Sequence, residues 1–276
     1  MTKRTVKRVL ECILLAILFV IFVFPFYWTL ITSVKSTMEA IQFPPTLWPS
    51  KFVWSNYAEV WQGSNFAHYG KNSIITSVGA TAVTIFFSVM AAYAFARYEF
   101  RFKKALFALS LADIMIPAQV IFLPIFVMYS SWGILNTYFS FIIIFIYSGS
   151  TIFFFRNAFM QVPGELIEAA RLDGSSELSV MFKVMLPAVR PFLITQIMLS
   201  FMSKWNGYFW IQTLTTNEKI RTLPIAMNNL VNQTEDYVSR WDLSMAGSVI
   251  LMAPLLILYI ICNRQMKVAF IGNGIK

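Results

Sequence analysis

The sequence is poor in charge, histidine and cysteine, and each shortage excludes a class of protein. Only 13% of its 276 residues are Asp, Glu, Lys or Arg, whereas soluble domains carry about 25%. A lone histidine, His68, cannot form a metal site, and Cys12 and Cys262 lack the spacing of metal ligands. We therefore expect no bound metal, two free thiols and no soluble domain.

The motifs of nucleotide binding and of common catalytic sites are also missing. No GxxxxGK[ST] sequence occurs, so the chain has no P-loop in which to hold a nucleotide phosphate. It lacks GxSxG, HExxH and any pair of carboxylates at catalytic spacing on one helix, and no DNA- or RNA-binding motif accompanies its net charge of +9. We expect a protein that is not an enzyme, binds no nucleic acid and no cofactor, and takes its energy from another chain.

Apolar residues, by contrast, make up 58% of the chain. A transmembrane helix needs about 20 consecutive apolar residues, and six stretches qualify. They cover residues 9–31, 72–96, 105–129, 137–159, 191–214 and 243–262. The first is too long for the apolar core of a signal peptide and has no cleavage pattern, so we expect it to remain as a helix. The predicted fold is an all-α integral membrane protein with six transmembrane helices, forming one domain over residues 1–276.

The segment between the first two spans, residues 32–71, is mixed in character. It contains three prolines and the tryptophans Trp48, Trp54 and Trp61, which favour an external loop with short helices at headgroup depth. A separately folded ectodomain is the alternative, but roughly forty residues without a disulfide would form a poor core.

Lysine and arginine are distributed unequally between the two sides of the predicted membrane. Of the 22 basic residues, fifteen lie in segments predicted to be inside and six in segments predicted to be outside, while Lys204 lies within the fifth span. By the positive-inside rule, both termini and residues 161–190 face the cytoplasm. The net positive charge therefore reflects orientation in the membrane.

Residues 161–190 are polar although apolar runs flank them on both sides. Pro163 suits a helix start, which predicts one helix over residues 165–172. Asp173-Gly174 supplies a turn, with Gly174 in the left-handed conformation, and a second helix is predicted from a Ser175 or Ser176 cap to just before Pro187.

This loop carries a motif. Glu168-Ala169-Ala170, followed by Gly174 and then by Val184 and Leu186-Pro187, resembles the EAA loop of ABC-importer permeases, the cytoplasmic segment that docks into the ATPase subunit. Val184 departs from the isoleucine that the family usually has. The resemblance implies ATPase coupling by Glu168, Ala169, Ala170, Arg171, Asp173, Gly174, Leu186 and Pro187. The alternative is an amphipathic connector lying on the membrane surface.

Further short motifs resemble the carbohydrate-importer permeases of the maltose type, and in particular the smaller, six-helix subunit of that heterodimeric pair. They are Asn56-Tyr57, Asn72-Ser73, Ala92-Tyr93-Ala94-Phe95-Ala96-Arg97, Ile116-Pro117, Trp205-Asn206, and Phe270, Gly272 and Ile275-Lys276 in the tail. The resemblance implies a multi-pass protein of the bacterial cytoplasmic membrane. Its implied partners are a second homologous permease, two cytoplasmic ATPase subunits that bind ATP and Mg²⁺, an extracytoplasmic solute-binding protein, membrane lipid and a sugar moved by alternating access.

Polar groups inside the predicted spans point to a solute pathway. An ionisable group in hydrocarbon costs a few kcal/mol and usually faces water or a partner. Lys204, Trp205 and Asn206 on the fifth span could line the pathway, because tryptophan stacks on sugar rings and asparagine bonds hydroxyls. Alternatively, Lys204 satisfies a carbonyl or an acid on a neighbouring helix. We expect Asp113, a buried acid of the third span, to have a structural role.

Other functions stay open at this point. A permease of the same class could import another hydrophilic solute, such as a polyol or glycerol phosphate. An ion-driven secondary transporter would need paired intramembrane acids and an inverted repeat, for which Asp113 alone is thin support. A membrane-embedded enzyme would need clustered His, Asp or Glu residues, and the sequence has no such cluster.

Overall fold

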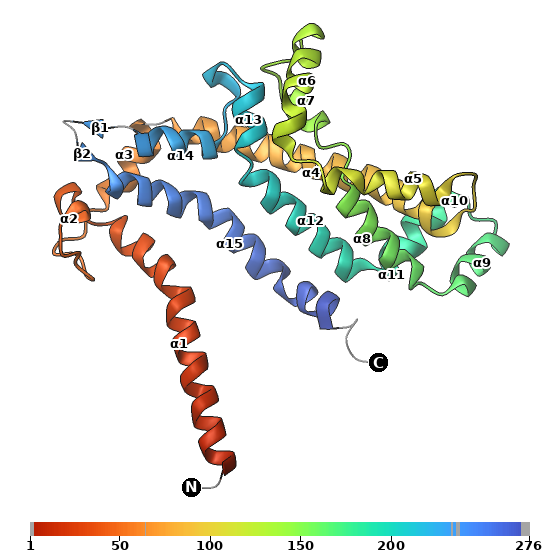
Figure 1. The fold of residues 1–276 in the computed structure, drawn as a ribbon, viewed down its shortest axis with the longest axis horizontal. Helices are drawn as coiled ribbons and strands as arrows, with labels where there is room; N and C mark the ends of the chain where they lie inside the picture. Colours follow the sequence, from red (N-terminus) through yellow and green to blue (C-terminus); the bar gives the residue numbers. More distant parts are fainter. Residues whose placement is uncertain (1–2, 64, 233, 236–237, 272–276) are drawn as a thin grey trace. The chain divides into compact units, whose positions relative to one another are not determined.

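The computed structural model describes residues 3–63, 65–232, 234–235 and 238–271. Within these ranges the chain is almost entirely helical, which confirms the predicted all-α class (Figure 1). The only extended pair in the described residues is β1 (Thr234–Glu235) with β2 (Val238–Ser239), joined in antiparallel register. The chain forms two compact units, Met1–His68 with Ala226–Pro254 and Tyr69–Ile225 with Leu255–Lys276, and each is described by itself.

The first unit begins with α1 (Lys3–Thr32), whose Pro25 lies inside the helix. None of its most apolar stretch is buried within the chain. A helix that is apolar on all sides must be covered by lipid or by another protein. This agrees with the prediction of a first membrane span.

The loop after α1 contains α2 (Thr37–Ile41) and α3 (Ser55–Gly63). Lys35, only 1% exposed, donates from Nζ to the backbone oxygen of Thr46 at 2.5 Å and lies 4.5 Å from the centre of the Trp28 ring. The Glu39 carboxylate accepts hydrogen bonds from the Ser50 backbone N–H and from the Ser50 and Thr46 hydroxyls, each at 3.0 Å. The expected short helices are therefore present, and buried polar contacts fix the chain between them.

The second unit contains most of the remaining helices. They are α4 (Phe66–Arg97), α5 (Lys103–Ser110), the 3₁₀ turn η1 (Ala112–Ile114), α6 (Ala118–Ser131), α7 (Tyr138–Ile143), α8 (Gly149–Met160), α9 (Gly164–Leu172), α10 (Glu177–Ser179), the π-helical turn η2 (Val180–Met185), α11 (Leu186–Ala188), α12 (Arg190–Trp205), α13 (Phe209–Leu214) and the 3₁₀ turn η3 (Glu218–Ile220). Three helices contribute to both units: α4, through its residues 66–68, α14 (Leu223–Asn232) and α15 (Trp241–Ile271).

Three helices in the described ranges are long and apolar enough to cross a bilayer: Lys7–Thr32, Phe66–Arg97 and Trp241–Lys267. Two bent pairs raise the number to five if each pair is one span. They are Lys103–Ile114 with Ala118–Ser131, bent by 98°, and Glu177–Ala188 with Arg190–Trp205, bent by 89°. The six-span count therefore stays a prediction.

The predicted third, fourth and fifth spans are each broken, where continuous helices were expected. The third bends before Pro117, which has no N–H to donate to a helical hydrogen bond. The fourth separates into α7 and α8 around residues 144–148. The fifth ends as α12 at Trp205, and a side chain on Gly207 would press within 3.0 Å of the Lys204 backbone oxygen, so glycine permits the turn into α13.

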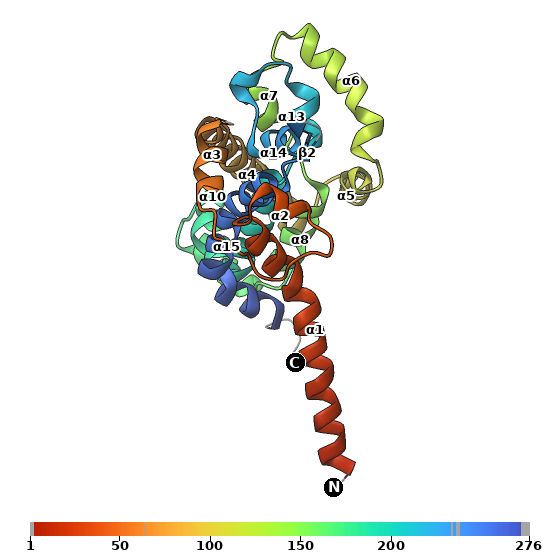
Figure 2. The same ribbon diagram turned by 90° about the vertical axis from the view of Figure 1, so that its left-hand side faces the viewer.

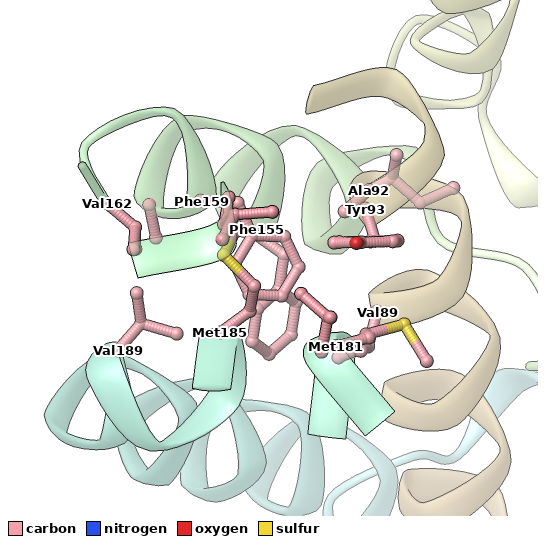
Figure 3. Close-up of a cluster of buried hydrophobic side chains, with 13 residues drawn as sticks. Val89, Ala92, Tyr93, Phe155, Phe159, Val162, Met181, Met185 and Val189 are labelled. Atoms are coloured by element: carbon pink, nitrogen blue, oxygen red, sulfur yellow. The ribbon is translucent and has the colours of Figure 1, made fainter. Parts of the chain in front are cut away.

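Two apolar clusters hold the second unit together. The loop cluster joins α4 and α8 to the segment 162–189, and Figure 3 shows its side chains pointing toward one another. The α13 cluster joins α13 to α6 and α7, which pack against it (Figures 1 and 2). The loop cluster consists of Val89, Ala92, Tyr93, Ile152, Phe155, Ala158, Phe159, Val162, Ile167, Val180, Met181, Met185 and Val189. The α13 cluster consists of Tyr129, Phe141, Ile211, Leu214, Ile220 and Ile225.

Candidate functional site

The first candidate site is the polar loop, and its first helix forms as expected. α9 begins directly after Pro163 and ends at Leu172. Gly174 has a φ of +78°, the left-handed conformation predicted for it. The N–H groups of Gly174 and Ser175 donate to the backbone oxygens of Arg171 and Ala170, both at 3.0 Å, and so satisfy carbonyls at the end of the helix.

The second half of the loop differs in part from the prediction. Ser176 caps it, since its hydroxyl accepts from the Ser179 N–H at 3.3 Å. The prediction that this helix ends before Pro187 is wrong, because helical structure continues through η2 and α11 to Ala188. In η2 the chain takes a wider π turn just before Pro187, which moves the proline ring away from the carbonyl that an α-helical turn would place against it.

The predicted coupling residues lie mostly on the surface of this loop. Those on the exposed side are Glu168, Ala169, Arg171, Asp173, Gly174 and Pro187, while Ala170 and Leu186 are half-buried and pack against the loop cluster. Leu172 is 89% exposed, and Leu166 and Leu178 are exposed as well. Large apolar side chains exposed on an otherwise polar segment are typical of a surface that contacts another protein.

The opposite side of the loop is fixed to the long helices. Ile167 of α9 and Val180 of η2 are buried in the loop cluster. Met181 and Met185 of η2 are buried there too, beside Phe155 and Phe159 of α8 and Val89 of α4 (Figure 3). At the end of α4, the Arg97 guanidinium donates to the backbone oxygens of Phe159 at 2.5 Å and Val162 at 2.6 Å. The loop is therefore packed onto α4 and α8, and Arg97 hydrogen-bonds α4 to the end of α8 and to the segment just before α9.

Glu177 joins the two halves of the loop to α4. Its carboxylate accepts from the Arg171 guanidinium at 2.8 and 3.2 Å and from the Tyr93 hydroxyl at 2.7 Å. Hydrogen bonds from Arg171, Tyr98 and Tyr93 lower the pKa of Glu177 to about 2. The sequence analysis missed Glu177, Tyr93 and Arg97 as parts of this site. The sequence did contain one signal for this contact: Arg171 and Glu177 carry opposite charges on either side of the predicted Gly174 turn.

The second candidate site is the end of α12, where three residues were expected to line a pathway. Lys204 is half-buried, and its Nζ donates to the Ser200 hydroxyl of the same helix at 3.1 Å and lies 5.1 Å from the centre of the Phe145 ring. Trp205 is only 2% exposed and stacks on Phe201, with ring centres 5.6 Å apart. Asn206 is exposed and caps α12. Lys204 and Asn206 are thus accessible in this chain, and Trp205 is covered.

Other polar candidates have simpler roles. Asp113 is exposed rather than buried, and its carboxylate accepts from the Gly149 N–H at the start of α8 at 3.0 Å. Cys12 and Cys262 are free thiols, as expected. Within the described ranges, no group of three or more His, Cys, Asp or Glu residues could hold a metal ion.

Comparisons with known proteins agree on one class, the membrane components of transport systems. The family described as "Binding-protein-dependent transport system inner membrane component" matches residues 84–267. The Escherichia coli (strain K12) inner membrane ABC transporter permease protein YcjP is 30% identical, over 99% of this chain and 98% of that protein. The Bacillus subtilis (strain 168) arabinooligosaccharides transport system permease protein AraQ is 27% identical, over 99% of this chain and 97% of that protein.

A solved structure has a similar fold. It is the crystal structure of a bacterial ABC transporter involved in the import of the acidic polysaccharide alginate, one chain of which matches with a TM-score of 0.84. The match covers 96% of this chain and 98% of that chain at 23% sequence identity. At this identity the likeness supports the fold alone.

Proposed function

The chain belongs to the family of binding-protein-dependent transport system inner membrane components, and from this premise we propose that it is one permease subunit of an ATP-driven sugar importer. It is a multi-pass inner-membrane protein whose part in transport is not catalytic. The observation that carries the proposal is the polar loop, which is fixed on one side to α4 and α8 and exposes charged, small and leucine side chains on the other.

In this proposal the exposed side of α9 docks into a cytoplasmic ATPase subunit. Two such subunits bind ATP and Mg²⁺, a second homologous permease completes the heterodimeric pathway, and a solute-binding protein delivers the sugar from outside. Both termini and the loop face the cytoplasm, consistent with the excess of Lys and Arg in those segments. The uncovered surface of α1 is available to lipid or to the partner permease.

The geometry suggests how a push on α9 would reach the membrane helices. Displacement of α9 must move Ile167, which is buried in the loop cluster together with side chains of η2, α8 and α4. Close-packed interiors transmit such a shift because they deform little. The Glu177 contacts with Arg171 and Tyr93 add a second attachment to α4. Closure of the ATPase pair would thereby tilt α4 and α8 and switch the pathway between its outward-open and inward-open states.

The proposed solute is a carbohydrate, in particular an oligosaccharide. A relative that matches almost the whole chain and is named for arabinooligosaccharide transport supports this choice. Lys204, Trp205 and Asn206 remain our proposed pathway residues, with Trp205 needing a rearrangement before its ring could meet a sugar. A polyol or glycerol phosphate is the alternative solute. An ion-driven carrier is disfavoured by the family membership.

Co-purification in mild detergent tests the proposal. We expect the chain to bring with it a second permease and two ATPase subunits, and the reconstituted complex to take up labelled oligosaccharide only when ATP and the binding protein are present. A chain that purifies alone and transports along an ion gradient without ATP would refute it. Competition by unlabelled glycerol phosphate or polyols separates the alternative solutes.

A further inference from the structure

The three broken spans of the second unit meet at one place. The Tyr147 hydroxyl donates to the backbone oxygen of Ser110, the Gly149 N–H donates to Asp113, and the Lys204 ammonium lies over the Phe145 ring. These contacts connect the break before Pro117, the break between α7 and α8, and the end of α12. We call residues 113–117, 144–149 and 204–207 the break layer.

The break layer lies at membrane depth. At 1.5 Å per residue, the 12 residues of α8 span about 18 Å and the 16 residues of α12 about 24 Å. α8 ends at the polar loop and α12 begins there, so both helices run between the loop and a break, and the hydrocarbon core is about 30 Å thick. Both breaks therefore fall inside the hydrocarbon core, in its outer half.

Irregular backbone at this depth needs a special environment. It occurs only where it is buried in protein or lines a water-filled cavity, because lipid cannot satisfy free N–H and C=O groups. In this chain Tyr147 and Asn206 are exposed and Phe145 and Lys204 are half-buried, so the layer is not closed over by the chain's own helices. Gly149 holds the layer tightly, since a side chain there would overlap the Ser110 oxygen and the Asp113 carboxylate.

The two charges of the layer differ in what they contact. Asp113 accepts from the N–H at the start of α8, where the helix dipole favours a negative group. Lys204 has only the Ser200 hydroxyl and the Phe145 ring, and it forms no ion pair with any acid in the described part of the chain. An ammonium without a counter-ion at membrane depth is costly and marks a place where a ligand or a partner supplies the negative charge.

We infer that the break layer is where this subunit contacts its solute, and that Lys204 binds a negatively charged group on it, either the carboxylate of an acidic sugar or a phosphate. The inference rests on the proposed function and narrows its substrate class. An ammonium held by one hydroxyl keeps two N–H donors for such an oxygen. The ring of Phe145 covers one side of the ammonium, so such an oxygen would approach from a side that the ring leaves open.

The test uses the complete importer with its binding protein and ATPase subunits, reconstituted in vesicles. The probes are trigalacturonate against its methyl ester, in which each carboxylate is an uncharged ester, and glycerol 3-phosphate against glycerol. We expect ATP-dependent uptake of one of the two acids and weak uptake of its uncharged counterpart. The acid that is taken up distinguishes a carboxylate from a phosphate.

Variants then assign the charge to Lys204. K204M should raise the KM for the transported acid about tenfold, K204R should stay within about threefold, and K104M, which removes an exposed lysine of the predicted cytoplasmic loop, should behave as wild type. In a background with Cys12 and Cys262 replaced by serine, K204C should regain uptake when a thiol reagent attaches an ethylammonium group and not when it attaches an ethylsulfonate.

Each contrary result has a separate meaning. Equal KM values for wild type and K204M, or no recovery of K204C by the ammonium reagent, would overturn the role of Lys204. Preference of the wild-type importer for the uncharged probe would overturn the inference and leave the proposed function intact. Uptake of no probe in an ATP-dependent manner would count against both. Loss of assembly in K204M but not in K204R would instead identify a partner-subunit acid as the counter-ion, and so also overturn it.

Discussion

Among single side chains, Glu177 joins the two halves of the polar loop to each other and to α4. It receives hydrogen bonds from Arg171 on one side of the Gly174 turn and from Tyr93 of α4 on the other. Its carboxylate must be ionised to accept all of them. The arrangement therefore predicts a specific dependence on pH.

The pKa of Glu177 is lowered from an ordinary value of 4.5 to about 2. A depressed carboxyl pKa contributes stability that is fully present above pH 4.5 and is lost as the pH falls toward 2. A spin label on L172C, at the exposed end of α9, should keep the same mobility above about pH 5 and become progressively more mobile as the pH falls from 4.5 toward 2. In E177Q the label should be more mobile at neutral pH and show a smaller change with acid, whereas E165Q should match wild type. Identical profiles for all three would contradict this role.

Gly174 is required for its backbone conformation and not for space. Its φ of +78° is strained for residues with a side chain, yet nothing lies within 4 Å of where a Cβ would sit. G174A should therefore cost about 1–2 kcal/mol locally, G174N less, and G174P should abolish ATP-dependent uptake while leaving membrane insertion intact. G164A, also in open space but without a positive φ, is the control and should be nearly neutral. Uptake and thermal stability in detergent measure these effects, and equal behaviour of G174A and G164A would contradict the account.

At the scale of elements, α9 has two faces with different roles. Ala169 lies on the exposed face and Ala170 is half-buried against the loop cluster. A169W should leave expression and thermal stability unchanged and lower ATP-dependent uptake at least tenfold, because a bulky side chain would block close approach of the ATPase. A170W should also destabilise the permease, since overpacking typically costs about 1–3 kcal/mol. Normal uptake by A169W would count heavily against docking through this face.

η1 and the start of α8 form a tight joint, in which Gly149 packs closely against Ser110 and Asp113. G149A places a methyl group against the Ser110 oxygen and the Asp113 carboxylate, neither of which can move without displacing a helix end. We expect a loss of about 1–3 kcal/mol in stability and a marked fall in uptake. G79A meets only the flexible end of Ile142 and should be much milder. Thermal unfolding in detergent measures the difference, and equal melting temperatures would show that the joint is not tight.

The same elements show how far the sequence could predict the structure. α9, the Gly174 turn and the Ser176 cap follow from local chemistry, since Pro163, Gly174 and Ser176 each favour one backbone geometry. The breaks in the third to fifth spans do not, because apolar composition looks the same in a whole helix and in two half-helices. The Glu177 contact with Tyr93 depends on tertiary packing between residues 84 positions apart, which no local pattern reveals.

At the scale of the whole molecule, the chain is incomplete without partners. α1 buries none of its most apolar stretch, and the exposed face of α9 carries leucines that the chain itself leaves uncovered. Lys204 has no counter-ion in the described residues. A lipid bilayer, an ATPase and a solute would each cover one of these features. The importer assembly proposed above would cover all three.

Site-specific photo-cross-linking in the assembled importer tests the central claim most directly. A photoreactive amino acid is placed at Leu172, at the exposed end of α9, and in a separate variant at Trp54, an exposed residue of the predicted external loop. The account predicts that position 172 labels the ATPase subunit and position 54 does not. Labelling of no polypeptide from position 172, or of an extracytoplasmic protein, would contradict it.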